Sequence, residues 1–277
     1  MSTTFDAAVT GKQWLTRIAC LFMMVMFTAV VKSMFRNKIV CHDFIKLGKG
    51  ILRVIFFDID DTLFDNTGAE IKAAKRYYQE FPELHVHGGE DEFIQRWRQT
   101  TEIYLQLFIE RRISFQEQRR KRLRDIFRRP LNDREADTLF NIYLNHYEKS
   151  WQLFEDVTPC LDRLEAFRLG VITNGNTRQQ CQKLRDLGIM DRFEIVLVSQ
   201  AIGISKPEKE IFLHACKTAA EKPQDCLYIG DKLDVDAHAA QKAGLKGIWL
   251  NRRNLKAATA GISEINGLNE LHSAFIR

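Results

Sequence analysis

The sequence has 277 residues, which is enough for one large or two smaller domains with a sizeable hydrophobic core. Its 45% apolar and 28% charged residues are ordinary for a soluble globular protein, and the net charge of +5 favours anionic partners without requiring nucleic acid. The six cysteines are scattered, with no CxxC pair and no zinc-site spacing, which argues against a disulfide framework and favours a reduced, cytoplasmic protein.

Residues 1–50 differ from the rest of the chain and form a predicted N-terminal extension. Within it, residues 18–31 carry no charge and have lysine and arginine on both sides. A membrane-spanning helix needs about 20 apolar residues, so this segment is short for a span. Three interpretations stay open: a weak membrane anchor, a helix packed on the globular body, or a dispensable extension. We favour an accessory hydrophobic helix.

The next segment joins an apolar run to a cluster of carboxylates. The run from Val54 to Phe57 has no polar alternation, which predicts a strand buried on both faces, as in a parallel sheet. Asp58 would lie at the carboxyl end of this strand, where open α/β sheets bind their ligands. Asp60, Asp61 and Asp65 follow, and four carboxylates this close repel one another unless a cation is present. Their oxygen ligands favour a hard divalent metal, Mg²⁺, over the alternative of a solvated acidic turn.

A helical block follows, from about residue 67 to 155. Apolar residues recur there at helical spacing, no strand pattern interrupts them, and Asn132 is a predicted helix N-cap. The middle of the block, from Arg111 to Arg129, is strongly basic. We expect its apolar residues to pack inward and its arginines to face solvent. The alternatives are a positive rim that steers anionic substrates and a nucleic-acid patch.

From Pro159 onward, predicted helices and strands alternate, which indicates βαβ units and a parallel sheet. The strands that follow the first one are expected at residues 169–173, 194–198, 226–229 and 246–250. The helices are expected at residues 159–168, 178–187, 207–219 and 235–243. Gly170, Gly188 and Gly244 are expected to close three of these helices, and Pro207 is expected in the first turn of its helix.

Three polar segments follow strands of this predicted sheet. They are Thr173 to Asn176, Ser205 to Pro207, and Gly230 to Asp236. Because each follows a buried strand, all three would face the same crevice as Asp58. Each segment alone is a weak signal, and together in this order they are a strong one.

In these motifs the chain resembles the haloacid dehalogenase-like (HAD) superfamily of hydrolases. The matching residues are Asp58 to Thr62, Thr173 to Gly175, Lys206, and Gly230 to Asp236. The resemblance implies an α/β fold, a Rossmann-like parallel sheet core with an inserted all-helical cap domain. The helical block lies where that superfamily inserts its cap. The implied domains are the extension 1–50, the core 51–66 with 156–277, and the cap 67–155.

The resemblance also implies chemical roles. Asp58 would be the nucleophile that forms an aspartyl-phosphate, and Asp60 would protonate the leaving oxygen and then activate water. Asp60 must be protonated for the first step, so we expect apolar or like-charged surroundings that raise its pKa. The Thr173 hydroxyl and the backbone N–H of Asn174 would bind the transferring phosphoryl group. Lys206 would hold the oxygens of the nucleophile and of the phosphoryl group together.

The implied magnesium ligands are Asp58, Asp231 and the main-chain carbonyl of Asp60. Asp236 is expected to contact the metal indirectly, as a supporting or water-mediated member of the metal site. The remaining aspartates of these motifs are expected to be structural or exposed: Asp61, Asp65 and Asp234.

We therefore predict a Mg²⁺-dependent phosphomonoesterase that hydrolyses a small phosphorylated metabolite. The aspartate two residues after the nucleophile favours a phosphatase or a phosphomutase over a dehalogenase. Resemblance to other members suggests a nucleotide, flavin mononucleotide or a sugar phosphate such as an acylneuraminate 9-phosphate. The alternatives are a sugar phosphomutase and a non-catalytic membrane-associated binding module. We expect a cytoplasmic protein without a nucleic-acid partner; weak membrane association through residues 18–31 stays open, and the oligomeric state is unassigned.

Overall fold

The computed structural model describes residues 46–47, 50–127, 129–258 and 261–271. The chain divides into two units, Met1–Asp43 and Phe44–Arg277, and all the described residues belong to the second unit. The expectations for residues 18–31 therefore lie outside the described residues. None of the helices described has the length and apolar character that crossing a bilayer requires.

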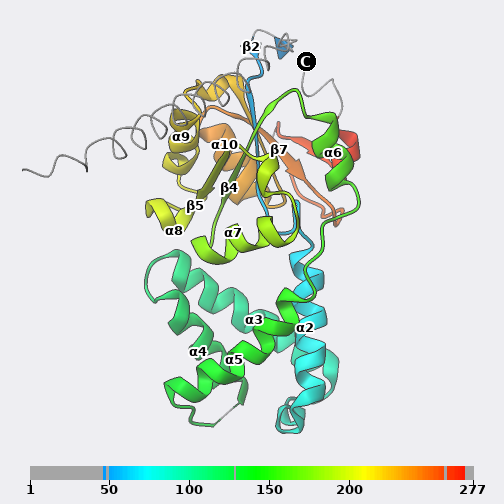
Figure 1. The fold of residues 1–277 in the computed structure, drawn as a ribbon, viewed down its shortest axis with the longest axis vertical. Helices are drawn as coiled ribbons and strands as arrows, with labels where there is room; N and C mark the ends of the chain where they lie inside the picture. The colour runs from blue at the N-terminus through cyan, green and yellow to red at the C-terminus, as the bar shows by residue number, and fades with distance from the viewer. Residues whose placement is uncertain (1–45, 48–49, 128, 259–260, 272–277) are drawn as a thin grey trace, which may run out of the picture. The chain divides into compact units, whose positions relative to one another are not determined.

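A six-stranded parallel sheet forms the core of the second unit (Figure 1). In spatial order its strands are β5 (Ile195–Val198), β4 (Arg168–Thr173), β3 (Val54–Phe57), β6 (Cys226–Gly230), β7 (Lys246–Leu250) and β8 (Ser263–Ile265). The predictions for β3 to β7 are confirmed to within one residue at each end. The short edge strand β8 was not predicted, because three residues are too few to show a pattern. A small antiparallel pair precedes the sheet: β1 (Lys46–Leu47) and β2 (Gly50–Ile51).

Helices cover both faces of this sheet, and alternate residues of β3 supply the two interfaces. Ile55 and Phe57 belong to the hydrophobic cluster of one face, and Val54 and Phe56 belong to that of the other. On the first face lie α6 (Val157–Arg163) and α7 (Thr177–Asp186), and on the second α9 (Lys209–Thr218) and α10 (His238–Lys242). The remaining short elements are α8 (Ser199–Ile202), η1 (Pro82–His87), η2 (Met190–Arg192), η3 (Pro223–Asp225), η4 (Leu233–Ala237) and η5 (Leu268–Glu270). This three-layer arrangement confirms the predicted Rossmann-like core.

Two of the local predictions were wrong. Gly170 does not end a helix, because α6 ends at Arg163 and Gly170 lies inside β4. A Cβ atom at Gly170 would lie 2.6 Å from the Phe56 ring, so this glycine is needed for close packing between neighbouring strands. Pro207 is not in the first turn of α9, because a hydrogen-bonded turn between Ser205 and Glu208 precedes that helix. Gly188 and Gly244 do follow their helices with positive φ angles, as predicted.

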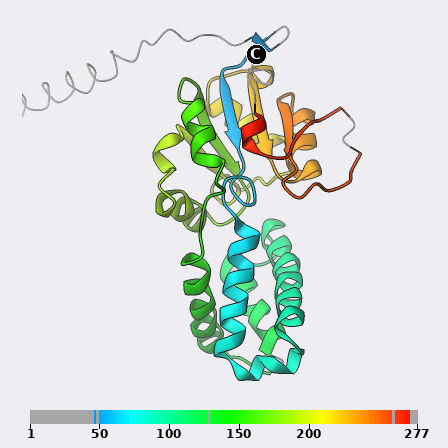
Figure 2. The ribbon, with the colours of Figure 1, turned by 90° about the vertical axis from the view of Figure 1, so that its right-hand side faces the viewer.

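Of the five α-helices that the described residues form between β3 and β4, the first four form the cap, visible as the lower part of the second unit in Figures 1 and 2. They are α2 (Asn66–Glu80), α3 (Glu90–Ile109), α4 (Phe115–Phe127) and α5 (Asp133–Glu148). Asn132 is the N-cap of α5, as predicted, and its side chain accepts a hydrogen bond from the N–H of Glu135. Tyr77, Trp97 and Tyr143 pack together in the aromatic centre of the cap.

The two chain segments that join the cap to the core are paired with each other. Phe64 and Leu153 form an antiparallel bridge, and the N–H of Phe154 donates to the carbonyl of Leu63 over 3.2 Å. The N–H of Asp65 donates to the carbonyl of Gln152 over 3.1 Å. The cap is therefore attached through a short two-stranded ribbon.

The basic run in the cap has two kinds of arginine. Arg120 and Arg124 lie on the surface and pair with Asp133 and other carboxylates at distances down to 2.5 Å. Arg122 differs, because it is only 6% exposed and its guanidinium lies 4.9 Å from the centre of the Trp97 ring. The expectation that the arginines of this run face solvent was therefore wrong for Arg122.

The close packing of Gly170 against the neighbouring strand can be tested by mutation. Replacing Gly170 by alanine should lower the free energy of unfolding by about 1–3 kcal/mol, because the new methyl group overpacks against Phe56. Urea denaturation measures this loss. A matched control is Gly89→Ser, since a Cβ atom at Gly89 meets nothing within 4 Å, and we expect a change within about 0.5 kcal/mol. Equal stability of Gly170→Ala and the wild type would contradict the packing described.

Candidate active site

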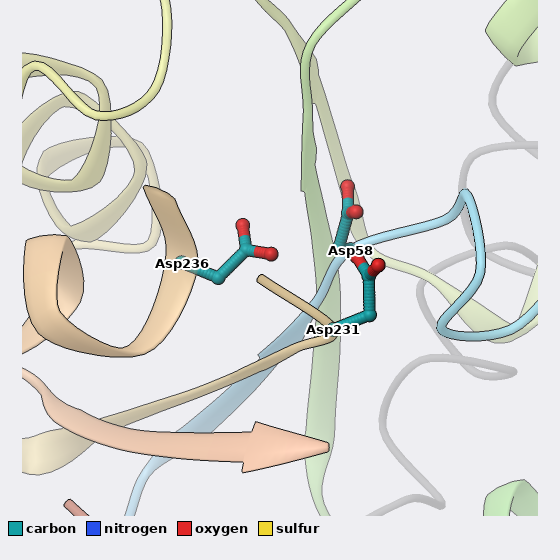
Figure 3. Close-up of side chains that lie close together, drawn as sticks. All are labelled: Asp58, Asp231 and Asp236. Atoms are coloured by element: carbon teal, nitrogen blue, oxygen red, sulfur yellow. The ribbon is translucent and has the colours of Figure 1, made fainter. Parts of the chain in front are cut away.

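Three aspartates meet at the carboxyl ends of the central strands. Asp58 directly follows β3 and Asp231 directly follows β6, and these two strands are paired in the sheet. Asp236 comes from the helical turn η4 after β6. One carboxylate oxygen from each of the three lies within 4.8 Å of the others, and Figure 3 shows the side chains pointing into a common space. The structure therefore brings together the three aspartates that the order of the motifs predicted to lie close to one another.

Lys206 joins two of these aspartates. Its ammonium nitrogen lies 2.8 Å from Oδ1 of Asp58, 2.7 Å from Oδ1 of Asp236 and 2.8 Å from the hydroxyl of Tyr228. These three neighbours match the three N–H donors of an ammonium group. Burial lowers the pKa of Lys206, but Asp236 and Asp58 outweigh this effect and raise it overall. Lys206 is thus held as a buried cation.

Without a metal ion, the negative charges of the three aspartates exceed the positive charge of Lys206 beside them. Burial, and then the neighbouring carboxylates, raise the pKa of Asp231 to about 8. Burial raises the pKa of Asp58 to about 6, although Lys206 acts in the opposite direction. Among the described residues, Oδ1 of Asp231 is buried and has no hydrogen-bond partner. An all-oxygen donor set with an unsatisfied buried oxygen and excess negative charge fits a hard divalent cation.

Asp236 contributes differently from the other two aspartates. It is completely buried, and its Oδ1 lies against Lys206 and accepts from the hydroxyl of Tyr228 over 3.1 Å. Its Oδ2 accepts from the backbone N–H of Lys232 over 2.9 Å. Both oxygens are therefore occupied by protein donors, which suits the indirect, supporting role expected from the sequence.

Thr173 and Asn174 follow β4 and reach the same crevice. The Thr173 hydroxyl is buried and accepts a hydrogen bond from Nε2 of Gln180 over 2.8 Å. The Asn174 side chain accepts from the N–H of Lys206 over 2.8 Å and donates to its carbonyl over 2.9 Å. Asn174 therefore fixes the loop that carries Lys206, which is a contribution that the sequence did not indicate.

Asp60 lies in surroundings that differ from the expectation. Its Oδ1 lies 2.5 Å from the ammonium nitrogen of Lys183, and its Oδ2 accepts from Nε2 of Gln180 over 2.9 Å. Lys183 is a buried cation on α7 that also lies 5.0 Å from the centre of the Phe64 ring. The expected apolar or like-charged environment is therefore wrong, because a lysine and an amide face this carboxyl group.

Sequence reasoning missed Gln180 and Lys183. They are three residues apart and so share one face of α7, which is the one signal that could have found them. The other three aspartates behave as expected. Asp61 accepts from the N–H of Thr67, Asp65 caps α2 and Asp234 is exposed.

A cavity of about 80 Å³ begins at Asp60 and extends between the cap and the core. We call it the cap cavity. Its core side is formed by Asp60, Gln179, Gln180 and Lys183. Its cap side is formed by Asn66, Glu70, Thr101, Leu105, Phe115, Gln118, Arg119, Arg122, Phe140, Tyr143, Leu144 and Tyr147. A group bound beside Asp60 would therefore touch residues of the cap.

Comparisons with known proteins identify the family of this chain. The family model of haloacid dehalogenase-like hydrolases matches residues 52–244. Glyceraldehyde 3-phosphate phosphatase from Pyrococcus abyssi is 30% identical over 72% of this chain and 81% of its own length. N-acylneuraminate-9-phosphatase from Homo sapiens is 25% identical over 76% of this chain and 86% of its own.

Solved structures show the same fold. The HAD-hydrolase YfnB from Bacillus subtilis, solved bound to magnesium, superposes with a TM-score of 0.64 at 24% identity. The superposition covers 81% of this chain and 98% of that one. Since the family match runs from before Asp58 to beyond Asp236 and these curated relatives are named as phosphatases, the chain belongs to the haloacid dehalogenase-like hydrolases and is a phosphatase of that family.

Proposed function

We propose that this phosphatase hydrolyses a small phosphorylated metabolite with the help of Mg²⁺, through an aspartyl-phosphate formed on Asp58. The observation that carries the proposal is the placement of Asp58 at the end of β3, in ion contact with Lys206 and beside Asp231. A buried carboxylate beside a fixed cation is suited to attack a phosphorus atom, whose oxygens carry the negative charge.

The proposed reaction has two proton-coupled steps. A carboxylate oxygen of Asp58 attacks phosphorus, the bond from phosphorus to the ester oxygen breaks, and Asp60 gives its proton to the leaving alcohol. Asp60 then takes a proton from water, whose oxygen attacks phosphorus and releases inorganic phosphate and free Asp58. Thr173, Asn174 and Lys206 hold the phosphoryl oxygens during both steps.

Lys183 and Gln180 set the direction of the Asp60 carboxyl group in this scheme. Both contacts come from α7, which also forms the core side of the cap cavity. Proton donation to the substrate requires that the ion pair between Asp60 and Lys183 be exchanged for a contact with the leaving oxygen. Binding of the substrate would therefore change the contacts between Asp60 and α7.

The carboxylate oxygens of Asp58 and Asp231 suit Mg²⁺. The main-chain carbonyl of Asp60 is the further ligand that the family resemblance implies. When bound, the ion would offset the negative charge shared by the nucleophile and the phosphoryl group. The related YfnB is described as binding magnesium, which supports this choice. Among the substrate classes expected from the sequence, sugar phosphates gain support from the names of the curated relatives.

The nucleophile can be tested with p-nitrophenyl phosphate as a generic ester. Asp58→Asn should lower turnover by more than about 10³-fold while leaving the circular dichroism spectrum unchanged, because the amide cannot form the acyl-phosphate. The matched control is Asp234→Asn, which removes an exposed carboxylate of the same motif and should keep full activity. Turnover by Asp58→Asn at the wild-type rate would refute the mechanism.

The metal can be tested through stability as a function of pH. Because the pKa values of Asp58 and Asp231 are raised above their unfolded value of 3.8, the metal-free fold binds their protons more tightly than the unfolded chain does. This stabilisation is present at low pH and is lost as pH rises through about 6 and then about 8. In EDTA, the urea midpoint should therefore fall between about pH 5 and about pH 9.

Adding Mg²⁺ should restore the midpoint at the alkaline end, since a bound cation replaces the lost protons. Asp231→Asn is the matched variant, and we expect it to show a weaker pH dependence and a smaller response to Mg²⁺. A wild-type midpoint that Mg²⁺ leaves unchanged at high pH would argue against the proposed metal site.

A further inference from the structure

We infer that the cap cavity binds a second anionic group of the substrate, a carboxylate, through Arg122 and Arg119. This inference rests on the proposed function, because it assumes that the phosphate group of the substrate lies at Asp58. It names a feature of the substrate class, namely a phosphate ester that is also a carboxylic acid.

Arg122 carries the first part of the argument. Arg122 is only 6% exposed, yet its Nε and Nη2 atoms have no hydrogen-bond partner among the described residues. No carboxylate of the described residues lies within the 4.0 Å of an ion pair with it. Its nearest neighbours are instead aromatic, with the Trp97, Phe140 and Tyr143 ring centres at 4.9, 5.2 and 5.6 Å.

A buried guanidinium with unsatisfied donors is costly for a fold to keep. The same helix shows that suitable partners were available, since Arg120 and Arg124 pair with Asp133 at its surface. Stacking on aromatic rings offsets part of the cost, and Tyr143 interacts with the guanidinium as a hydrogen-bond partner, but Nε and Nη2 have no partner among the described residues and can bind a ligand. Arg122 is therefore placed as a binding group rather than as a structural one.

Two further side chains of α4 support this placement. Gln118 is 2% exposed, and its Oε1 atom, which has no hydrogen-bond partner among the described residues, can accept from a hydroxyl or N–H group of the substrate beside the carboxylate. Arg119 is half-buried, with its guanidinium 4.4 Å from the centre of the Phe115 ring. Because residues three and four positions apart share a helix face, these two and Arg122 line the same cavity.

The charges that line the cavity leave an excess of positive charge at α4. Asp60 is paired with Lys183 at 2.5 Å, so these two charges offset each other. Glu70 is then the other carboxylate of the cavity lining, and its charge acts on Arg122, whereas the carboxylates that act on Arg119 are Glu148 and Asp137, which do not line the cavity. Burial raises the pKa of Glu70, and the charge of Arg122 acts in the opposite direction. An added anion would restore the balance.

A carboxylate fits this site better than a second phosphate does. It is planar, it accepts two parallel hydrogen bonds from a guanidinium, and it is small enough for a cavity of about 80 Å³. Glyceraldehyde 3-phosphate, the substrate named for one group of relatives, has no such group. N-acylneuraminate 9-phosphate, named for the other, is a carboxylic acid, so the arginines favour substrates of that kind.

The experiment compares esters that differ mainly in a carboxylate, at two lengths. The short pair is 3-phosphoglycerate and glycerol 3-phosphate, and the long pair is N-acetylneuraminate 9-phosphate and its C1 carboxamide. In at least one pair, wild-type kcat/KM should be at least about 10-fold higher for the carboxylated ester. Arg122→Met should bring this ratio close to one, and Arg122→Lys should retain part of it.

Two controls keep the test decisive. Arg124→Met removes the same charge from the same helix outside the cavity and should leave the ratio unchanged. Arg119→Gln changes a less buried side chain and should also lower the ratio, so a failure of Arg122→Met to fold leaves the inference testable. A wild type that hydrolyses p-nitrophenyl phosphate but prefers neither carboxylated ester would overturn the inference and leave the proposed function standing.

If the wild type hydrolyses no ester at all, the proposed function fails and calorimetry decides the inference. Binding of either carboxylated ester to the wild type that is at least about 10-fold tighter than binding of its partner, and that Arg119→Gln weakens, would uphold the carboxylate site. Equal affinity for both members of both pairs would overturn it.

Discussion

The active site depends on the contacts made by the buried ammonium group of Lys206. It lies between Asp58, Asp236 and Tyr228, so it links the ends of β3 and β6 to the loop that follows β5. Asn174 binds the backbone of the same lysine from the end of β4. Removing one member of such a buried group leaves an uncompensated charge, which typically costs about 3–5 kcal/mol. The same contacts therefore order the catalytic crevice and stabilise the sheet edge that supports it.

The strands and the aspartates that follow them could be predicted from the sequence because both are encoded locally. A buried parallel strand is a short apolar run, and Asp58 and Asp231 come directly after two such runs. Lys183 and Arg122 could not be predicted in the same way. A charged residue on a helix shows the same sequence pattern whether the face next to it meets water, a carboxylate or a ring. Their partners, Asp60 and Trp97, lie far away in the chain.

Gly170 shows the same limit for small residues. A glycine after a helical pattern usually marks a helix end, whereas Gly170 lies in β4 because the Phe56 ring occupies the space of a side chain. The information that decides between the two is carried by a neighbouring strand more than a hundred positions away in sequence. The sequence therefore predicted features that depend on neighbouring residues. It did not predict features that depend on the packing of two elements distant in the chain.

The paired segments between core and cap have a mechanical consequence. Phe64 and Leu153 lie opposite each other, and Asp65 and Gln152 are hydrogen-bonded beside them. A two-stranded ribbon bends readily across its width, but sliding one strand past the other breaks its hydrogen bonds. Any movement of the cap relative to the core must therefore bend this ribbon or break its hydrogen bonds. Because Arg122 on the cap and Asp60 on the core line the same cavity, the ribbon also joins the two walls between which a substrate would lie.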